Sequence, residues 1–302
     1  MKPTLTLGTA MWGWTMPKEI CFEVLNYYYE RGFRQIDTAT NYPINKQPED
    51  FRRSETILQE WIYTHGVQDL QNIVKIGSVN NLRSPEHNLN KSFILMNLDD
   101  YHHKYGANFN MLMIHWDNRD EESTIRETLE ALEEARKLGM KIGLSGIKYP
   151  AIYQKLNSEF QFDFHIQFKH NLLQSDYDRY AVFHGRQRFT TYGINASGLK
   201  LETAAYREDS SLKARGGNVD TIHPITVSLQ QILAEANQTT NRPKLSTMNH
   251  LGMLYAYHSP DVESILIGPS KLSQLQDSLD FFEHLQHFDY TDVYHQLRKI
   301  SL

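Results

Sequence analysis

From Leu5 onward, short apolar runs alternate with longer segments in which apolar residues recur at helical spacing. Eight such runs are centred on residues 5–10, 34–39, 72–77, 111–116, 141–147, 164–168, 189–194 and 264–268. Each run has the length of a buried strand, and each is separated from the next by polar or periodic sequence. A strand followed by a helix, repeated along the chain, is typical of a parallel sheet. The chain is therefore predicted to belong to the α/β class.

Three of the intervening segments are predicted to be helices, at residues 18–32, 54–66 and 123–139. All three end at a glycine suited to a C-cap, and the third is also expected to open with Ser123 or Thr124 as its N-cap. Eight strand and helix units with no linker and no fixed-period repeat favour a single (β/α)8 TIM barrel over residues 1–302 rather than two domains. The polar stretch 195–221 is expected to be a long loop after strand seven and a candidate lid.

Composition narrows the function classes. Apolar residues make up 40% of the 302 residues and aromatic residues 12%, which is enough for a large core. The net charge of −5 is spread along the chain without a basic stripe, so nucleic acid is not an expected partner. The one cysteine, Cys21, excludes an internal disulfide framework, and the fourteen histidines show no metal-binding spacing. No signal peptide or membrane span is recognisable, so a soluble cytoplasmic protein is expected.

Polar residues stand where three successive runs end. Asp37, Lys75 and His115 close the second, third and fourth runs, and Tyr42 follows the second. In a barrel, the chemistry lies at the carboxyl ends of the strands, so these four side chains are expected at one mouth. Asp37 and Lys75 could instead form an ion pair that only closes the barrel, and a single histidine in this position could be a core residue bonded to backbone. Four groups that hold or move protons have no shared structural reason to converge, which favours an active site.

Seven segments resemble the aldo-keto reductase family in content, order and spacing: LGTAMWG, GFRQIDTATNY, IVKIG, MLMIHW, ETLEALEEARKLGMKIGLS, IQFKHNLL and ILIGPSKLSQLQDSL. The resemblance implies that Asp37, Tyr42, Lys75 and His115 form a catalytic tetrad. A carbonyl accepts hydride at carbon only as its oxygen receives a proton, and a tyrosine with an ordinary pKa near 10 needs help to donate one. Lys75 would lower the pKa of that phenol, Asp37 would keep the lysine charged, and His115 would hold the carbonyl oxygen.

The resemblance also implies a nicotinamide cofactor, NADP(H) or alternatively NAD(H), although the chain has no Gly-rich dinucleotide fingerprint after a strand. In that reading Ser145 and Gln167 bind the carboxamide and Tyr192 stacks on the ring, unless Tyr192 is an ordinary barrel aromatic. Gly8, Thr9 and Asp37 would lie nearby. The adenosine end is assigned to the segment after the last strand, where a helix is expected to open; the residues assigned to it are Gly268, Ser270, Lys271, Gln274 and Asp277.

Several positions depart from the family pattern. Gly146 stands where many relatives have asparagine, and Gly268 and Gln274 stand where some have lysine and arginine. Lys271 is then the one cation expected near a 2′-phosphate, which predicts a modest preference for NADPH. Trp12 and Trp116, just beyond strands one and four, are expected to wall the substrate pocket unless they are packing residues. The loop at residues 41–55 is longer than usual and is expected to shape specificity.

The sequence thus predicts an NAD(P)H-dependent reductase of a small-molecule aldehyde or ketone, with a sugar-like or otherwise polar substrate as one option. A regulatory subunit that binds cofactor with little turnover is an alternative within the same fold. A lyase or aldolase that uses Lys75 as a Schiff-base amine is a second alternative. The lyase is disfavoured because a nucleophilic lysine should be neutral, whereas Asp37 would keep Lys75 charged.

Overall fold

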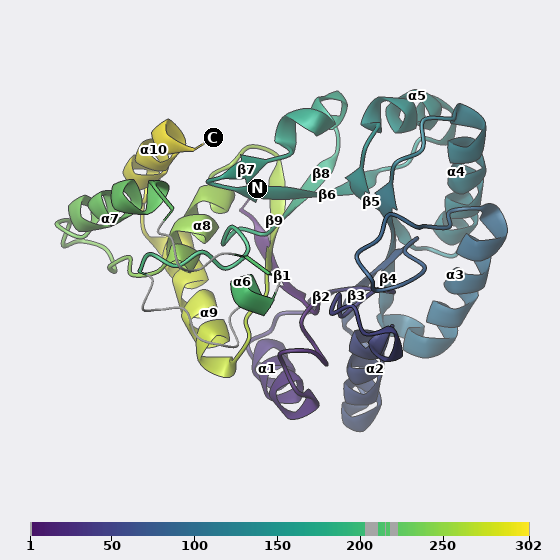
Figure 1. Cartoon of the computed structure of the whole chain (residues 1–302), viewed down its shortest axis with the longest axis horizontal. Coiled ribbons are helices and arrows are strands. Elements are labelled where there is room, and N and C mark those ends of the chain that lie inside the picture. Colours follow the sequence, from purple (N-terminus) through teal and green to yellow (C-terminus); the bar gives the residue numbers. More distant parts are fainter. Residues whose placement is uncertain (1, 203–210, 215, 218–222, 302) are drawn as a thin grey trace.

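The structure is a computed structural model, and it describes residues 2–202, 211–214, 216–217 and 223–301 (Figure 1). Its centre is a barrel of parallel strands. They are β1 (Thr4–Gly8), β2 (Gln35–Ala39), β3 (Gln71–Ile76), β4 (Phe109–Asp117), β5 (Lys141–Ile147), β6 (Phe164–Asn171), β8 (Arg188–Tyr192) and β9 (Val262–Ile267). The ring closes because β1 pairs with both β2 and β9, while β5 pairs with β6. The predicted (β/α)8 barrel is confirmed.

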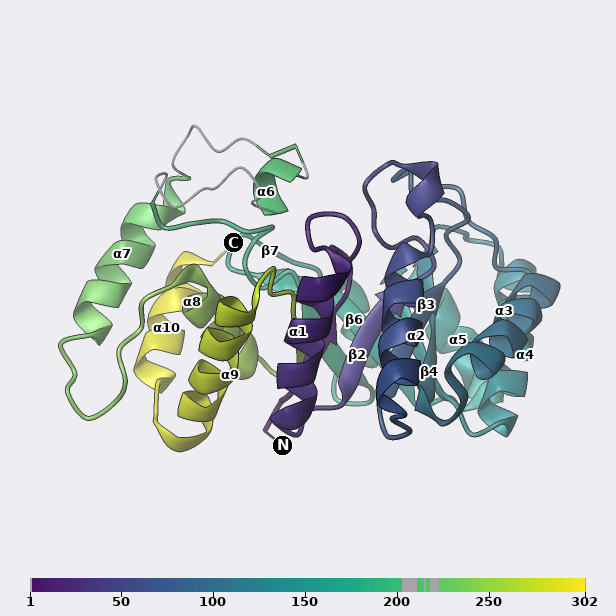
Figure 2. The same ribbon diagram turned by 90° about the horizontal axis from the view of Figure 1, so that it is seen from below.

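Helices surround this barrel, as the two views show (Figure 1, Figure 2). They are α1 (Lys18–Glu30), α2 (Arg53–His65), α3 (Lys91–Tyr105), α4 (Glu122–Lys137), α5 (Pro150–Phe160), α6 (Ser211–Ala214), α7 (Ile225–Ala236), α8 (Met248–Tyr257), α9 (Leu272–His287) and α10 (Thr291–Ile300). Short 3-10 turns lie at η1 (Pro48–Asp50), η2 (Gly106–Asn108) and η3 (Tyr177–Phe183). Among the helices of the described ranges, none combines the length and apolar character needed to cross a membrane.

Helix α4 shows how the sequence specifies these elements. Ile125, Leu129 and Leu132 recur at helical spacing and are all buried, whereas most of the charged residues between them face solvent. The N-cap prediction is wrong: the helix begins at Glu122, so Ser123 and Thr124 lie inside its first turn. The Glu121 carbonyl accepts the first intrahelical bond, which makes Glu121 the capping position although its side chain makes no cap.

Strand pairing aligns the candidate site residues in neighbouring strands. Gly8 lies opposite Asp37, His115 lies opposite Ser145, and Ser145 lies opposite Gln167. Side chains at paired positions of parallel strands share one level of a barrel, so these residues approach the same mouth. One small element was not predicted: β7 (Gln174–Ser175) folds back antiparallel onto the end of β6.

The predicted lid, residues 195–221, is described only at 195–202, 211–214 and 216–217, and the rest of it lies outside the described residues. The described part includes α6, a single short turn of helix. Figure 2 shows α6 on the same side of the barrel as the loops that follow β1 and β2. The segment therefore follows the seventh parallel strand, β8, as expected, and part of it lies at the candidate mouth.

Candidate active site

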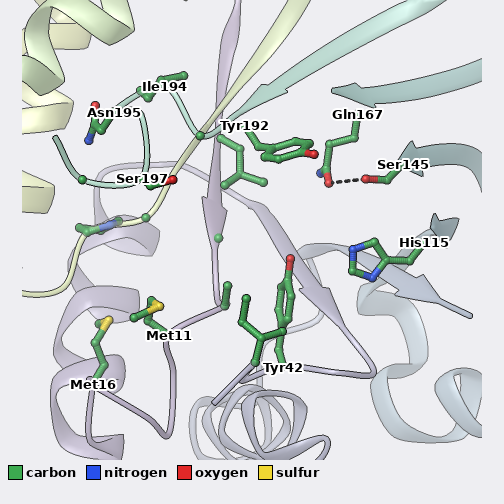
Figure 3. Close-up of a pocket in the computed structure, with 18 of the residues that line it drawn as sticks. Met11, Met16, Tyr42, His115, Ser145, Gln167, Tyr192, Ile194, Asn195 and Ser197 are labelled. Atoms are coloured by element: carbon green, nitrogen blue, oxygen red, sulfur yellow. Dashed lines mark hydrogen bonds between the residues drawn. The ribbon is translucent and has the colours of Figure 1, made fainter. Parts of the chain in front are cut away.

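The structure brings the four tetrad residues together. Lys75 and Asp37 form an ion pair in which both side chains are 1% exposed. The Lys75 Nζ lies 4.9 Å from the centroid of the Tyr42 ring. The His115 ring also meets the phenol ring edge-on, with centroids 6.1 Å apart and planes at 88°. Figure 3 shows the Tyr42 hydroxyl pointing into the cavity between Tyr192 and His115.

Lys75 is held as an ammonium ion. Burial disfavours its charged form, but the charges and hydrogen bonds of Asp37 and Tyr42 outweigh burial and raise the Lys75 pKa above its ordinary value. Both oxygens of Asp37 are occupied, since Oδ1 accepts from Lys75 and Oδ2 accepts from Gln167 Nε2 at 2.7 Å. The acid therefore fixes the lysine in charge and in position.

His115 is neutral in this setting. Burial, and after it the positive charge of Lys75, hold the pKa of the His115 imidazole well below its usual range. Its Nδ1 is buried and has no hydrogen-bond partner among the described residues. A neutral imidazole carries one ring proton, and a proton on Nδ1 would find no acceptor, so the favourable tautomer carries it on Nε2. That tautomer can donate a hydrogen bond to a ligand oxygen.

Trp116 packs beside His115 with an unusual backbone. The two rings have centroids 4.4 Å apart, and Trp116 has φ of +62°, in the left-handed region that bulky residues rarely adopt. Gly146, opposite it on β5, has φ of +68°, and a Cβ added there would lie 2.4 Å from Trp116 Cδ1. The indole thus occupies the space that a side chain at position 146 would need, which accounts for the departure from asparagine noted in the sequence.

A cavity of about 270 Å³ opens above the tetrad. The predicted residues that line it are Gly8, Tyr42, His115, Trp116, Ser145, Gln167, Tyr192 and Gly268. Asp37 and Lys75 lie beneath its surface. Ser145 Oγ donates to Gln167 Oε1 at 3.1 Å, which connects the predicted carboxamide pair to each other. Burial raises the pKa of the Tyr192 phenol, so its ring faces the cavity as a neutral aromatic.

Two predicted residues lie elsewhere. Thr9 is buried behind the cavity, where its Oγ1 donates to the Asp37 carbonyl at 3.0 Å and its own carbonyl accepts from Ser54 Oγ. Its bond to the Asp37 carbonyl helps to fix β2, the strand that carries Asp37. The expectation for Trp12 is corrected, because its side chain is buried in the hydrophobic core and does not line the cavity. Of the two tryptophans, Trp116 is the one in the cavity wall.

A second, larger hollow of about 700 Å³ continues from the first. Both are lined by Asn195, Gly198, Gly268 and Pro269. The predicted adenosine residues Ser270, Lys271, Gln274 and Asp277 line the larger one. The helix there begins later than expected, since α9 starts at Leu272 with Lys271 as its N-cap. Ser270 precedes the helix, and its N–H and Oγ both donate to Gln274 Oε1, at 2.8 and 3.0 Å.

Sequence reasoning missed several lining residues. Met11, Met16, Ile44, Ile194, Asn195 and Ser197 line the smaller cavity, and Lys200, Glu202, Thr247 and Asn249 line the larger one. The pair of methionines around the turn after β1 was a usable signal for the first group. Lys200 matters most for the electrostatics, because the sequence suggested Lys271 as the one cation of this region and the structure adds a second.

A family model described as the aldo/keto reductase family matches residues 4–298. The chain belongs to the aldo/keto reductase family. It is also similar to a curated protein from Pseudescherichia vulneris, named "Uncharacterized 11.2 kDa protein in crtE 3'region", with 40% identity over 67 residues. That match spans 21% of this chain and 61% of the relative. Carbonyl reduction with a nicotinamide cofactor is typical of this family.

The residues present fit such a cofactor. The two hollows form one extended cleft, since four residues line both, and its inner end lies beside Tyr42. At the junction of the two hollows, Asn195 Oδ1 is buried and accepts no hydrogen bond from the described residues. A ligand group that donates a hydrogen bond there would satisfy this oxygen. Gln167 and Ser145 each keep hydrogen-bonding capacity beyond the bonds they make to each other and to Asp37. An elongated ligand with an amide at one end suits this cleft.

Proposed function

We propose that this aldo/keto reductase reduces an aldehyde or ketone to the alcohol with NADPH, and that Tyr42 donates the proton. One observation carries the proposal: the Tyr42 hydroxyl points into the cavity between His115 and Tyr192, while the Lys75–Asp37 pair lies buried against the Tyr42 ring. One small cavity is thus surrounded by a proton donor, Tyr42, by a positive charge that stabilises its conjugate base, Lys75, and by a neutral hydrogen-bond donor, His115. These are the groups that carbonyl reduction requires.

Each residue has a distinct task in the proposed reaction. A nicotinamide held in the inner cleft would supply the hydride for the carbonyl carbon. As the oxygen gains electron density, it takes the proton from the Tyr42 hydroxyl, and the Lys75 ammonium stabilises the phenolate that is left. His115 donates from Nε2 to the same oxygen, which orients the carbonyl and offsets its developing charge. Asp37 acts through Lys75, by keeping it charged and in place.

We assign the inner cleft to the nicotinamide and the outer cleft to the adenosine end. Ser145 and Gln167 would bind the carboxamide, and Tyr192 would stack on the ring. Lys271 and Lys200 line the outer cleft, and so do Asp277 and Glu202, so the charges of two lysines are offset there by those of two carboxylates. Such a balanced site supports a preference for the 2′-phosphate of NADPH that is modest and sensitive to salt.

The Schiff-base lyase gains no support from the geometry. The Lys75 Nζ is paired with Asp37, is 1% exposed and does not line the cavity. The raised pKa of this lysine keeps the amine protonated, and a protonated amine cannot attack a carbonyl. The site therefore favours proton transfer over covalent catalysis.

The test is to measure binding of NADPH and NADH by titration, and then turnover of a panel of aldehydes and ketones by absorbance of the reduced cofactor. Tyr42→Phe should bind NADPH nearly as tightly as the wild type but lose about 10²- to 10⁴-fold in rate. If the phenylalanine variant keeps more than about a tenth of the rate, Tyr42 is not the donor. Tight cofactor binding without turnover of any carbonyl would instead indicate a cofactor-binding module.

A further inference from the structure

Large apolar side chains from three loops and strand ends line the smaller cavity. Met11 and Met16 come from the loop after β1, Ile44 from the loop after β2, and Trp116 from the end of β4. Figure 3 shows Met11 and Met16 on the side of Tyr42 opposite His115. Within the described part of the chain, no aspartate, glutamate, lysine or arginine lines this cavity. The polar side chains of the lining are Tyr42 and His115, assigned to the carbonyl, and Ser145, Gln167, Asn195, Ser197 and Tyr192, of which Ser145, Gln167 and Tyr192 are assigned to the cofactor. A charged substrate would therefore lose water there without an ion-pair partner among the described residues.

Ile44 is held in this wall by the loop after β3. The Arg83 Nε donates to the Ile44 carbonyl at 2.8 Å. On both sides of Ile44, Asn81 Nδ2 reaches the chain, with donor–acceptor distances of 3.3 Å to the Pro43 carbonyl and 2.6 Å to the Gln47 carbonyl. Asn81 is 1% exposed, so these bonds are shielded from water. The backbone that carries Ile44 is therefore fixed at three points.

The same loop also contacts the methionine turn. The Arg83 guanidinium lies 5.5 Å from the centroid of the Trp14 ring, and Trp14 stands between Met11 and Met16 in sequence. Close to Tyr42, Thr40 Oγ1 donates to the Ser78 carbonyl at 3.1 Å in a buried position. The loops after β1, β2 and β3 are thus tied to one another on the apolar side of the cavity. A wall fixed in this way has one shape and cannot widen easily for a larger ligand.

We propose that Ile44 sets the size limit of the substrate and that Asn81 is the residue that positions it. The substrate class is an uncharged, unbranched apolar aldehyde or ketone, which replaces the sugar-like option raised by the sequence. This inference rests on the proposed carbonyl reduction and deepens it. The volume of the cavity also limits the size of the substrate, since about 270 Å³ must admit the nicotinamide ring as well.

The test compares three aldehydes with the purified full-length protein and saturating NADPH: pentanal, its branched isomer 3-methylbutanal, and the charged 4-oxobutanoate. The two isomers have the same atoms, so their ratio of kcat/KM reports shape rather than hydrophobicity. A tight apolar pocket discriminates by about 10- to 200-fold per misplaced methylene, and pentanal should be favoured over 3-methylbutanal by at least about tenfold. Pentanal should also be favoured over 4-oxobutanoate.

Ile44→Ala should reduce the isomer ratio to within about threefold, while Ile44→Val should give an intermediate ratio. Asn81→Ala should lower the ratio in the same direction without changing the dissociation constant of NADPH. The matched control is Asn80→Ala. The Asn80 amide oxygen accepts from Leu82 N and Ser84 Oγ within its own loop, at 2.9 and 3.0 Å, and so this variant should keep the wild-type ratio.

The outcomes separate this inference from the proposed function. If the wild type reduces the isomers equally well, or keeps its isomer ratio in Ile44→Ala, Ile44 does not set the size limit, although carbonyl reduction stands. If the wild type favours 4-oxobutanoate over pentanal, the proposed uncharged substrate class is wrong. If Asn80→Ala lowers the ratio as much as Asn81→Ala, Asn81 is not the positioning residue. If none of the three aldehydes, nor any other carbonyl, is turned over, the proposed function itself fails. Should Asn81→Ala not fold, Ile44→Ala and Ile44→Val still decide the size limit.

Discussion

Replacing Gly146 by alanine should destabilise the fold and disturb the active site together. The backbone at Gly146 has φ of +68°, which costs a residue with a Cβ about 1–2 kcal/mol. The new methyl group would also lie 2.4 Å from Trp116 Cδ1, far inside van der Waals contact, so the indole or the strand must move. Overpacking of this kind costs about 1–3 kcal/mol. The two terms together predict a loss of about 2–5 kcal/mol in the free energy of unfolding.

Gly66→Ala is the matched control. Gly66 ends helix α2 with φ of +62°, close to the value at Gly146, but a Cβ added there would meet nothing within 4 Å. This variant should lose only the backbone term, about 1–2 kcal/mol. Urea unfolding of both variants therefore isolates the cost of the clash as the difference between them.

The catalytic readout follows from the place of Trp116. Its ring packs against His115, so an indole displaced by the new methyl group should also shift the imidazole. Gly146→Ala should lower kcat/KM for aldehyde reduction, whereas Gly66→Ala should leave it unchanged. Equal losses of stability in the two variants, or a Gly146→Ala variant with wild-type kinetics, would show that the indole yields without cost and that the close approach has no consequence.

Three further predictions address the tetrad, the cofactor and the response to pH. Lys75→Met should cost nearly as much rate as Tyr42→Phe, and the double variant should be little worse than either, as steady-state kinetics with one aldehyde would show. NADPH should bind about 5- to 30-fold more tightly than NADH, and Lys271→Ala should remove part of that margin in titrations at low salt, because Lys200 also lines the outer cleft. Burial lowers the pKa of His170 to about 4, so the unfolded chain binds a proton that the folded chain refuses once the pH falls below about 6.5. The free energy of unfolding should therefore fall by on the order of 2 kcal/mol between pH 7 and pH 5 from this residue, and urea titrations of His170→Gln should lack that part of the fall.

The strands could be predicted because their sequence carries the information locally. Runs such as 141–147 coincide with β5, and the others differ from the observed strands by a few residues at their ends. The two-residue strand β7 is too short to leave a periodic signal, and it forms only because the chain turns back on β6. The N-cap of α4 was misplaced because the preference for serine and threonine is a tendency, and here Glu121 takes that position by its backbone.

The residues of the candidate site also divide into those that a local sequence pattern predicts and those that it does not. Asp37, Lys75 and His115 are strand residues, so the barrel itself brings them together once the strands are placed. Ile44 and Asn81 lie in loops whose paths depend on hydrogen bonds between segments far apart in sequence, and no local pattern encodes such bonds. Trp12 was predicted to line the cavity, but one tight turn after β1 directs its side chain into the core instead.

One hydrogen-bonded chain connects the two halves of the site. Ser145 on β5 donates to Gln167 on β6, Gln167 donates to Asp37 on β2, and Asp37 accepts from Lys75 on β3. In the proposed reaction the first two residues bind the carboxamide and the last two govern the proton donor. A ligand that reorients Gln167 must therefore alter one of the two bonds that fix Asp37, and through Asp37 the position of the lysine beside Tyr42. Cofactor binding and proton donation are then properties of one network, because the same carboxylate serves both.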